Sequence, residues 1–331
     1  MNPIKLTTAE IANLWANYQT STMTTCVLRY FLAIVKDESL QPSISYALEL
    51  SQKHVSRLTA YFQEEGIPVP HGFTENDVNP NAMPLFSDEY LISYIQNLSK
   101  TWVSSNAIAL TISSRKDIRE FYTESLSSSS ALFNRSVEIM LSKGIYSRPP
   151  VIPYPEQEQW IQQQSYLNGL FGEKRPLDAL GIANLYSNIV LNNTGLTLVR
   201  GFSQCTKDEA FRRFLLKGIE IGKKHIELLS KPLKQEEITI PASSSMFVTT
   251  STEPPFSDRL MFTHVVQMMQ ISMADYGASL ATSMRRDIGA LYTLLISEVT
   301  SYSEEGTHLG ITKKWIERPP EAVNREELRK L

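Results

Sequence analysis

Apolar residues recur every three or four positions over most of the chain, which is the spacing of one face of an α-helix. The first such stretch begins with Thr7, followed three residues later by Glu10, a pair typical of the box that caps a helix N-terminus. A second stretch begins at Pro42, a residue suited to the first turn of a helix, and carries His54 on its apolar side. We therefore predict two helices within the first 66 residues.

The pattern changes between residues 67 and 86. This segment holds four prolines with scattered glycine, asparagine and aspartate, so it cannot continue a helix and favours an extended backbone. Ser87 then has the position of an N-cap for a third helix, and a fourth follows Asp117 and ends near Gly144. The first 150 residues thus predict four helices with a long extended segment in the middle.

The same pattern occurs a second time. The segment Glu49–His54 returns as Glu220–His225, so that the second histidine follows the first by 171 positions (225 − 54). Beyond the second proline-bearing segment, equivalent residues of the two copies lie 170 positions apart, as Asp88 and Asp258 do (258 − 88). A one-residue deletion confined to a linker, with the helices intact, is what a loop tolerates. The chain is therefore predicted to be an internal duplication.

The duplication predicts an all-α protein of two tandem four-helix bundles packed on each other. We expect the first bundle in residues 1–150, a connector in 151–176, the second bundle in 177–320 and a C-terminal tail in 321–331. A length of 331 residues provides for two such domains with full cores.

Composition and charge narrow the class of protein. With 32 basic and 35 acidic residues the net charge is −3, which lacks the basic excess of a nucleic-acid-binding protein. The two cysteines, Cys26 and Cys205, are not at equivalent positions of the repeat and indicate no structural disulfide. The sequence contains no signal peptide and no apolar stretch long enough for a transmembrane segment. We therefore expect a cytoplasmic protein that binds no nucleic acid.

Several short segments resemble a known family. They are Arg175–Leu177, Lys224–His225, Pro255–Asp258, Ser283–Asp287 and Trp315–Pro320. With them, the chain resembles an uncharacterised bacterial family, a domain of unknown function found mainly in bacilli, whose members look like tandem ferritin-like four-helix bundles. The resemblance implies an up-down-down-up order of helices in each bundle, with the proline-rich segment as the crossover. It implies no assigned activity.

A ferritin-like bundle raises the hypothesis of a metal site. Di-iron bundles use a glutamate from each of two helices and Glu-x-x-His from each of the other two. Glu49 precedes His54 by five residues, which places the two side chains about 140° apart around a helix, so they cannot share an ion. A di-iron cofactor is therefore disfavoured, and no cofactor is expected. The metal-ligand candidates that remain open are His225, His54, Glu298, Asp275 and His264.

The favoured interpretation of these histidines is structural. A buried polar group needs a hydrogen-bond partner, and a histidine on an apolar stripe more often bonds a neighbouring side chain than a ligand. Residues that come to similar heights in the predicted bundles would form an internal polar cluster in each: Asn17, His54 and Tyr122 in the first, Asn188, His225 and Tyr292 in the second.

The fourth helix of each predicted bundle begins with a charged pair, Arg115 with Asp117 and Arg285 with Asp287. An aspartate in the first turn is stabilised by the positive end of the helix dipole. We therefore expect these pairs to tie the corner between the third and fourth helices.

No motif for nucleotide hydrolysis, zinc proteolysis or serine-esterase chemistry occurs in the chain. The sequence therefore predicts a non-enzymatic binding or structural protein of unknown ligand, with homo-oligomerisation left open. The alternative is a ferritin-like protein that binds a metal or a small ligand, an oxidoreductase included, centred on His54 and His225.

Overall fold

The structure, a computed structural model, describes residues 4–329. The first half of the molecule consists of α1 to α4, at Thr8–Ile34, Gln41–Glu64, Asp88–Thr111 and Lys116–Ser142. The second half consists of α5 to α8, at Ala179–Cys205, Glu209–Gln235, Asp258–Thr282 and Arg286–Lys313. The shorter elements are α9 at Arg325–Leu328 and three 3₁₀ helices, η1 at Glu75–Asp77, η2 at Gln164–Leu167 and η3 at Ser245–Phe247.

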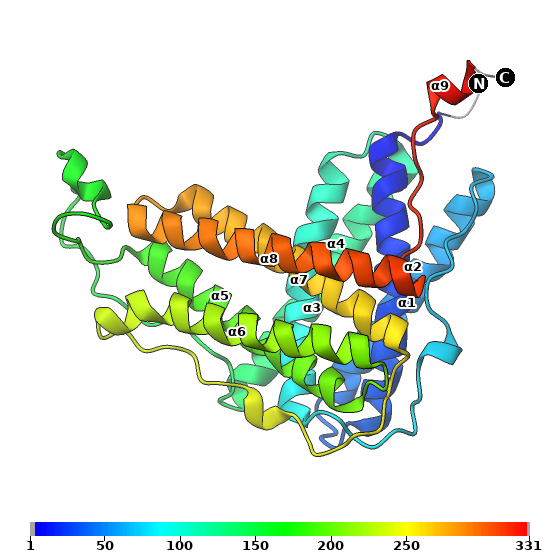
Figure 1. Ribbon diagram of the computed structural model, residues 1–331, viewed down its shortest axis with the longest axis horizontal. Coiled ribbons are helices and arrows are strands. Elements are labelled where there is room, and N and C mark those ends of the chain that lie inside the picture. The colour runs from blue at the N-terminus through cyan, green and yellow to red at the C-terminus, as the bar shows by residue number, and fades with distance from the viewer. Residues whose placement is uncertain (1–3, 330–331) are drawn as a thin grey trace.

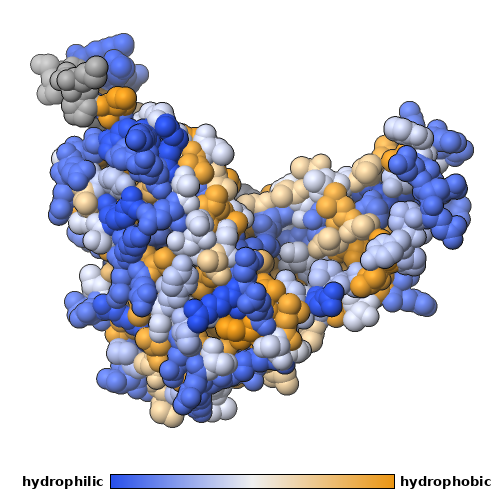
Figure 2. All heavy atoms as spheres, turned by 180° about the vertical axis from the view of Figure 1, so that it is seen from behind, coloured by the Kyte–Doolittle hydropathy of each residue, from blue (hydrophilic) through white to orange (hydrophobic). Residues whose placement is uncertain are grey.

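The predicted all-helical class and the repeat of four long helices are confirmed for the described residues. In each half the first helix packs on the second and the third on the fourth. Figure 1 shows α1 to α4 upright and α5 to α8 lying across them, with the connector and η2 at the far end of the second half. From behind, the molecule is hollowed between two diverging lobes, and apolar side chains lie on both sides of the hollow (Figure 2).

The segments between the second and third helices of each half pair with one another. We call residues 65–87 the first linker and residues 236–257 the second linker. Val78 forms an antiparallel bridge with Phe256, and Phe86 forms one with Val248. Because Val248 and Phe256 are the repeat equivalents of Val78 and Phe86, the two bridges are related by a pseudo-two-fold axis.

Backbone hydrogen bonds between the linkers follow the same symmetry. Asn79 donates to the carbonyl of Pro255 at 2.8 Å, and its equivalent Thr249 donates to Leu85 at 3.0 Å. Ser87 likewise donates to Phe247 at 2.9 Å, and Ser257 to Asp77 at 3.0 Å. The extended conformation expected for both linkers is therefore used to join the two halves.

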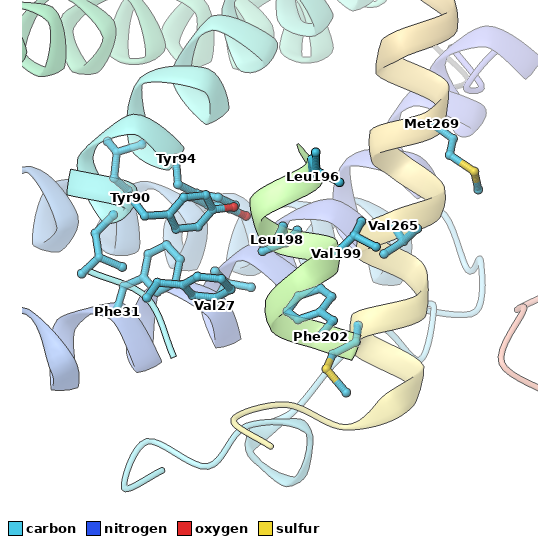
Figure 3. Close-up of a cluster of buried hydrophobic side chains, with 14 of the residues drawn as sticks. Val27, Phe31, Tyr90, Tyr94, Leu196, Leu198, Val199, Phe202, Val265 and Met269 are labelled. Atoms are coloured by element: carbon cyan, nitrogen blue, oxygen red, sulfur yellow. The ribbon is translucent and has the colours of Figure 1, made fainter. Parts of the chain in front are cut away.

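One apolar core runs through both halves. Its buried side chains come from all eight long helices of the described chain and from both linkers. Figure 3 shows Tyr90 and Tyr94 of α3 beside α5, with Leu198 on the side of α5 that faces them and Val199 pointing toward Val265 of α7. A smaller cluster, which includes Leu14, Leu58, Phe62, Ile118 and Phe121, fills the first half away from the contact. The two halves therefore share one large apolar cluster.

The helix N-termini show one difference from the predictions. Thr7 and Glu10 form the expected capping box. Ser87, by contrast, makes no capping hydrogen bond. Its equivalent Ser257 accepts from the backbone N–H of Leu260 at 3.1 Å while donating to Asp77 at 2.7 Å. The residue that matches Asp77 in the second linker is Phe247, which offers Ser87 no carboxylate, so the two hydroxyls differ in orientation.

The charged corners are built alike in both halves. Arg115 pairs with Asp117 and with Glu65 at the end of α2. Arg285 pairs with Asp287 at 2.9 Å and with Glu236 at the end of α6 at 2.7 Å. These ion pairs tie the start of the fourth helix to the end of the second, which extends the predicted role of the arginines beyond their own corner.

Glu10 links α1 to the same corner of the first half. Its carboxylate is fully buried and accepts backbone N–H groups from Thr7 at 2.7 Å and from Ser114 and Arg115 at 2.8 Å. Burial alone would raise the pKa of Glu10, but these hydrogen bonds outweigh it and lower the pKa from 4.5 to about 2. The charged form is therefore the one that the fold stabilises.

We predict that Glu10→Gln lowers the free energy of unfolding by about 1–2 kcal/mol at neutral pH, because hydrogen bonds to a buried carboxylate are stronger than those to an amide. The wild type gains this stability above pH 4.5 and loses it as the pH falls toward 2, where Glu10 becomes protonated in the folded state. Urea denaturation at several pH values measures the difference. Glu38→Gln, at an exposed position, is the control and should match the wild type throughout.

Candidate functional site

His54 lies in a mainly aromatic environment in the first half. Its ring is 5.4 Å from that of Phe121 and 6.0 Å from that of Trp102, measured between centroids. The Nε2 atom is 3.1 Å from the hydroxyl of Ser125. Burial lowers the pKa of His54 to about 4, so the imidazole is neutral at neutral pH.

The other two members of the predicted first cluster do not bond His54. The Asn17 side chain accepts a hydrogen bond from Ser21 at 2.9 Å. The Tyr122 hydroxyl is buried and has no partner at hydrogen-bond geometry among the described residues. Burial raises the pKa of Tyr122, and the nearby Asn17 amide opposes that rise only in part. Ser125, which the sequence prediction did not include, is the partner of the histidine.

His225 in the second half has both ring nitrogens in contact with polar atoms. Nδ1 is 3.2 Å from the hydroxyl of Tyr276 on α7, and Nε2 is 3.1 Å from a carboxylate oxygen of Glu298 on α8. The Tyr276 hydroxyl in turn accepts from the Asn192 amide on α5 at 2.8 Å. Burial lowers the pKa of His225, and the Glu298 carboxylate opposes that effect. Four helices thus contribute to one hydrogen-bonded chain.

Asn188 and Tyr292 belong to a second group of hydrogen bonds. The Asn188 amide donates to the hydroxyl of Ser279 at 2.9 Å and to that of Tyr292 at 3.3 Å. The two networks are joined by the Asn192 amide, which also donates to the backbone carbonyl of Asn188 at 2.7 Å, and the rings of Tyr276 and Tyr292 have centroids 6.0 Å apart. The structure brings Asn188 together with Tyr292 and gives His225 other side-chain partners.

The metal-ligand candidates are mostly dispersed. Glu298 contacts His225 and also pairs with Lys224. Asp275 lies 3.6 Å from the ammonium of Lys100. Within residues 4–329 no group of three or more histidine, cysteine, aspartate or glutamate side chains is placed to hold a metal ion. The structure brings together one pair, His225 with Glu298.

His264 lies at the pseudo-two-fold axis. Its Nε2 atom is 2.6 Å from the hydroxyl of Tyr94, which is its repeat equivalent in the first half. The ring also packs edge-on against Phe202, with centroids 6.1 Å apart. Burial lowers the pKa of His264 to about 4. A candidate metal ligand thus serves as a contact between the halves.

A cavity of about 360 Å³ lies where α1 and α3 of the first half meet the helices of the second half. Both His225 and His264 lie in its wall. Six of the lining side chains can be followed in Figure 3: Tyr90, Tyr94, Leu196, Val199, Val265 and Met269. Gln270, another lining residue, is exposed, so the cavity reaches the surface there.

The cavity wall is uncharged. Its lining contains no aspartate, glutamate, lysine or arginine, and most of it is aliphatic or aromatic, with several methionines. Methionine is flexible and adapts to irregular apolar shapes. A volume of this size falls in the range of small-molecule pockets, about 300–1,000 Å³.

Differences between the repeats explain why the cavity lies on one side. Trp102 packs beside His54 in the first half, whereas its equivalent in the second half is Ser272. Two residues of α6 that line the cavity are glycines, Gly218 and Gly222, where α2 has alanine and serine. Ser272 lines the cavity where the first half has an indole, whereas the space over Gly218 is taken by the Tyr302 ring and Gly222 lies against Leu196.

Sequence reasoning missed this cavity. The signal that could have found it is the exchange of Trp102 for Ser272 when the two halves are aligned. The periodic pattern of either half alone does not contain it, because serine and tryptophan both occur at partly buried helix positions.

The fold defines an all-helical protein with an internal repeat and an apolar core to which both halves contribute. The chain belongs to the family described as "Protein of unknown function (DUF3231)", whose profile matches residues 2–157 and, a second time, residues 165–328. This double match confirms the resemblance to a family of unknown function and its tandem occurrence here.

The other comparisons add little. No curated protein matches the chain. A crystal structure of a protein from Bacillus halodurans C-125, described as a candidate spore coat protein, is 18% identical with a TM-score of 0.43. The match covers 46% of this chain and 98% of that one.

We predict that the stability of the wild type falls as the pH decreases from 6.5 toward 4, since protonation of His54 favours the unfolded chain in that window. Besides burial, Arg57 and Lys53 lower the pKa of His54 and Glu124 raises it. In His54→Phe, the free energy of unfolding should decrease less steeply with falling pH, by about 1 kcal/mol per pH unit. Thermal or urea denaturation across this window measures it.

The matched control is His308→Phe on α8. His308 is exposed, so its ring is in water in both the folded and the unfolded state, and this variant should keep the wild-type pH dependence. An equal slope in His54→Phe and in the wild type would show that the folded protein protonates His54 without penalty.

Proposed function

We propose that the protein is a non-enzymatic binding protein that holds a neutral, mainly apolar small molecule in the cavity between its halves. The observation that carries the proposal is the uncharged cavity of about 360 Å³ walled by helices of both halves. Burial of a ligand's apolar surface against such a wall gains roughly 25 cal/mol per Å².

The charge distribution limits the ligand class. A phosphate, a nucleotide or a carboxylate buried here would find no lysine or arginine in the cavity wall. Burying an ion without a partner costs far more than apolar contacts return. The proposed ligand is therefore uncharged.

The side chains near the cavity favour binding over catalysis. Both ring nitrogens of His225 are already in hydrogen-bond contact. Neither cysteine lines the cavity, and burial raises the pKa values of Cys26 and Cys205 to about 12, which suppresses the thiolate that a nucleophilic cysteine needs. Burial also raises the pKa of Tyr276, so its hydroxyl stays protonated. These groups support a structural role for the polar atoms of the wall.

A metal-binding function has weaker support. It rests on the contact of His225 with Glu298, whereas a protein metal site of this kind uses three or more protein ligands. The alternative of a small-ligand site beside a buried histidine is supported by the position of His225, on α6, in the cavity wall.

We also propose that each half is a ferritin-like bundle, with the linker as its crossover, and that the halves divide at residues 150 and 177 as the sequence suggests. Support comes from the long linker between α2 and α3, and between α6 and α7.

A cytoplasmic location is likewise our proposal, supported by two buried free cysteines, one in each half. None of the helices in residues 4–329 combines the length and apolar content needed to cross a bilayer.

We predict that N-phenyl-1-naphthylamine, a neutral apolar fluorophore, binds the wild type with one molecule per chain and enhanced fluorescence. Ser272→Trp should weaken this binding at least about ten-fold, because it places in the second half the side chain that Trp102 provides in the first. Fluorescence titration measures the dissociation constant, and circular dichroism verifies the fold.

Ala274→Trp is the control. Ala274 lies on the same helix, two residues away, but is exposed and does not line the cavity, so this variant should bind as the wild type does. The proposal is wrong if the wild type does not bind the fluorophore, or if Ser272→Trp folds and binds it unchanged.

A further inference from the structure

A second pocket, of about 410 Å³, lies where the first linker meets the chain that follows α8. We call it the polar pocket. Its wall consists of residues of the first linker, Arg259 in the first turn of α7 and residues 314–317. Its charged side chains are Asp77, Arg259, Lys314 and Glu317. It shares no residue with the cavity between the halves and has the charged groups that the cavity lacks.

The two carboxylates of the polar pocket are engaged within the protein. Both oxygens of Glu317 lie within hydrogen-bond distance of the backbone nitrogen of His71, at 2.9 and 3.1 Å. One oxygen of Asp77 accepts the backbone N–H of Thr74 at 2.9 Å, and the other accepts the hydroxyl of Ser257 at 2.7 Å. Every carboxylate oxygen in the wall therefore already has a donor from the protein.

The basic side chains of the polar pocket are mostly unpaired. Arg259 donates through Nη2 to the carbonyl of Gly72 at 2.8 Å, and its guanidinium lies over the ring of Phe73, 4.5 Å from the centroid. Its Nε and Nη1 atoms have no hydrogen-bond partner among residues 4–329, and neither has the ammonium of Lys314, which is exposed. The unused hydrogen-bonding capacity of the wall is thus that of cationic donors.

The internal repeat does not account for these two cations. At the offset of 170 positions, Arg259 corresponds to Glu89 and Lys314 to Gly144. The first half therefore builds the same two helix ends with an acid and a glycine. Arg259 and Lys314 are specific to the second half, and the shared fold does not require them.

We propose that the polar pocket binds a small carboxylate with a single negative charge, held by Arg259 and Lys314. Guanidinium and ammonium groups form strong, charge-assisted hydrogen bonds with a carboxylate. The carboxylates of Asp77 and Glu317 in the same wall repel a second negative charge, so a phosphate dianion fits less well. This site is separate from the proposed function, because the two walls have no residue in common.

Benzoate and benzamide, which have similar shapes and differ in charge, test the proposal by isothermal titration calorimetry on the full chain at low ionic strength. We expect one benzoate per chain, bound at least about ten-fold more tightly than benzamide, because only benzoate forms charge-assisted hydrogen bonds. Inorganic phosphate at pH 8 should bind more weakly than benzoate. The proposal is overturned if benzoate does not bind, if benzamide binds equally well, or if phosphate binds more tightly.

Two variants test the residues. Arg259→Gln should weaken benzoate binding about ten-fold, with the fold verified by circular dichroism. Lys314 has a φ of 57°, in the left-handed region that glycine adopts without strain. Lys314→Gly should therefore raise the melting temperature while weakening benzoate binding at least about three-fold. Benzoate affinity unchanged in both variants would show that these two side chains do not hold the anion.

Glu237→Gly is the matched control for Lys314→Gly. Glu237 is also exposed, also has a φ of 57° and lines neither pocket, so this variant should raise the melting temperature and leave benzoate binding unchanged. Ser272→Trp, which fills the cavity between the halves, should also bind benzoate as the wild type does. Loss of benzoate binding in Ser272→Trp would place the anion in that cavity and overturn the proposal.

Discussion

The arrangement of this protein depends on the hydrogen bonding of its two linkers. An extended segment that leaves its backbone groups unpaired in a buried place is unstable, since each such group costs free energy. Each linker here finds its partner in the other one, through Asn79 with Pro255 and through Thr249 with Leu85. The pairing fixes how α1 and α3 meet α5 and α7, and hence where the shared core and the cavity lie.

The cavity and the buried histidines have a common physical basis. Water is largely excluded from the contact between the halves, which lowers the pKa of His264 and makes every unpaired polar atom costly. In the proposed function, the same exclusion would let apolar contacts supply the binding free energy. The polar groups around His225 are paired within the protein, through Tyr276 and Glu298.

The sequence predicts the helices well because their information is local. The capping box at Thr7 and the position of His54 on an apolar stripe follow from residues within one or two turns. The hydrogen-bond partners of the histidines cannot be predicted in this way, because they depend on how neighbouring helices are rotated. Ser125 faces His54 while Tyr276 faces His225, and no spacing along one helix reveals this. The pairing of linkers 170 positions apart is likewise not contained in either segment alone.

Joining both halves in one chain has a consequence at the axis. In a dimer of identical subunits, a residue on a two-fold axis meets its own copy. Here Tyr94 meets His264, so a hydroxyl group and an imidazole nitrogen face each other as donor and acceptor. Two tyrosines or two histidines at this place would form such a pair less readily. Likewise, a substitution can affect one half of the molecule only, as where Trp102 of the first half corresponds to Ser272 of the second. Covalent fusion therefore permits a contact surface that is symmetric in backbone and unequal in chemistry.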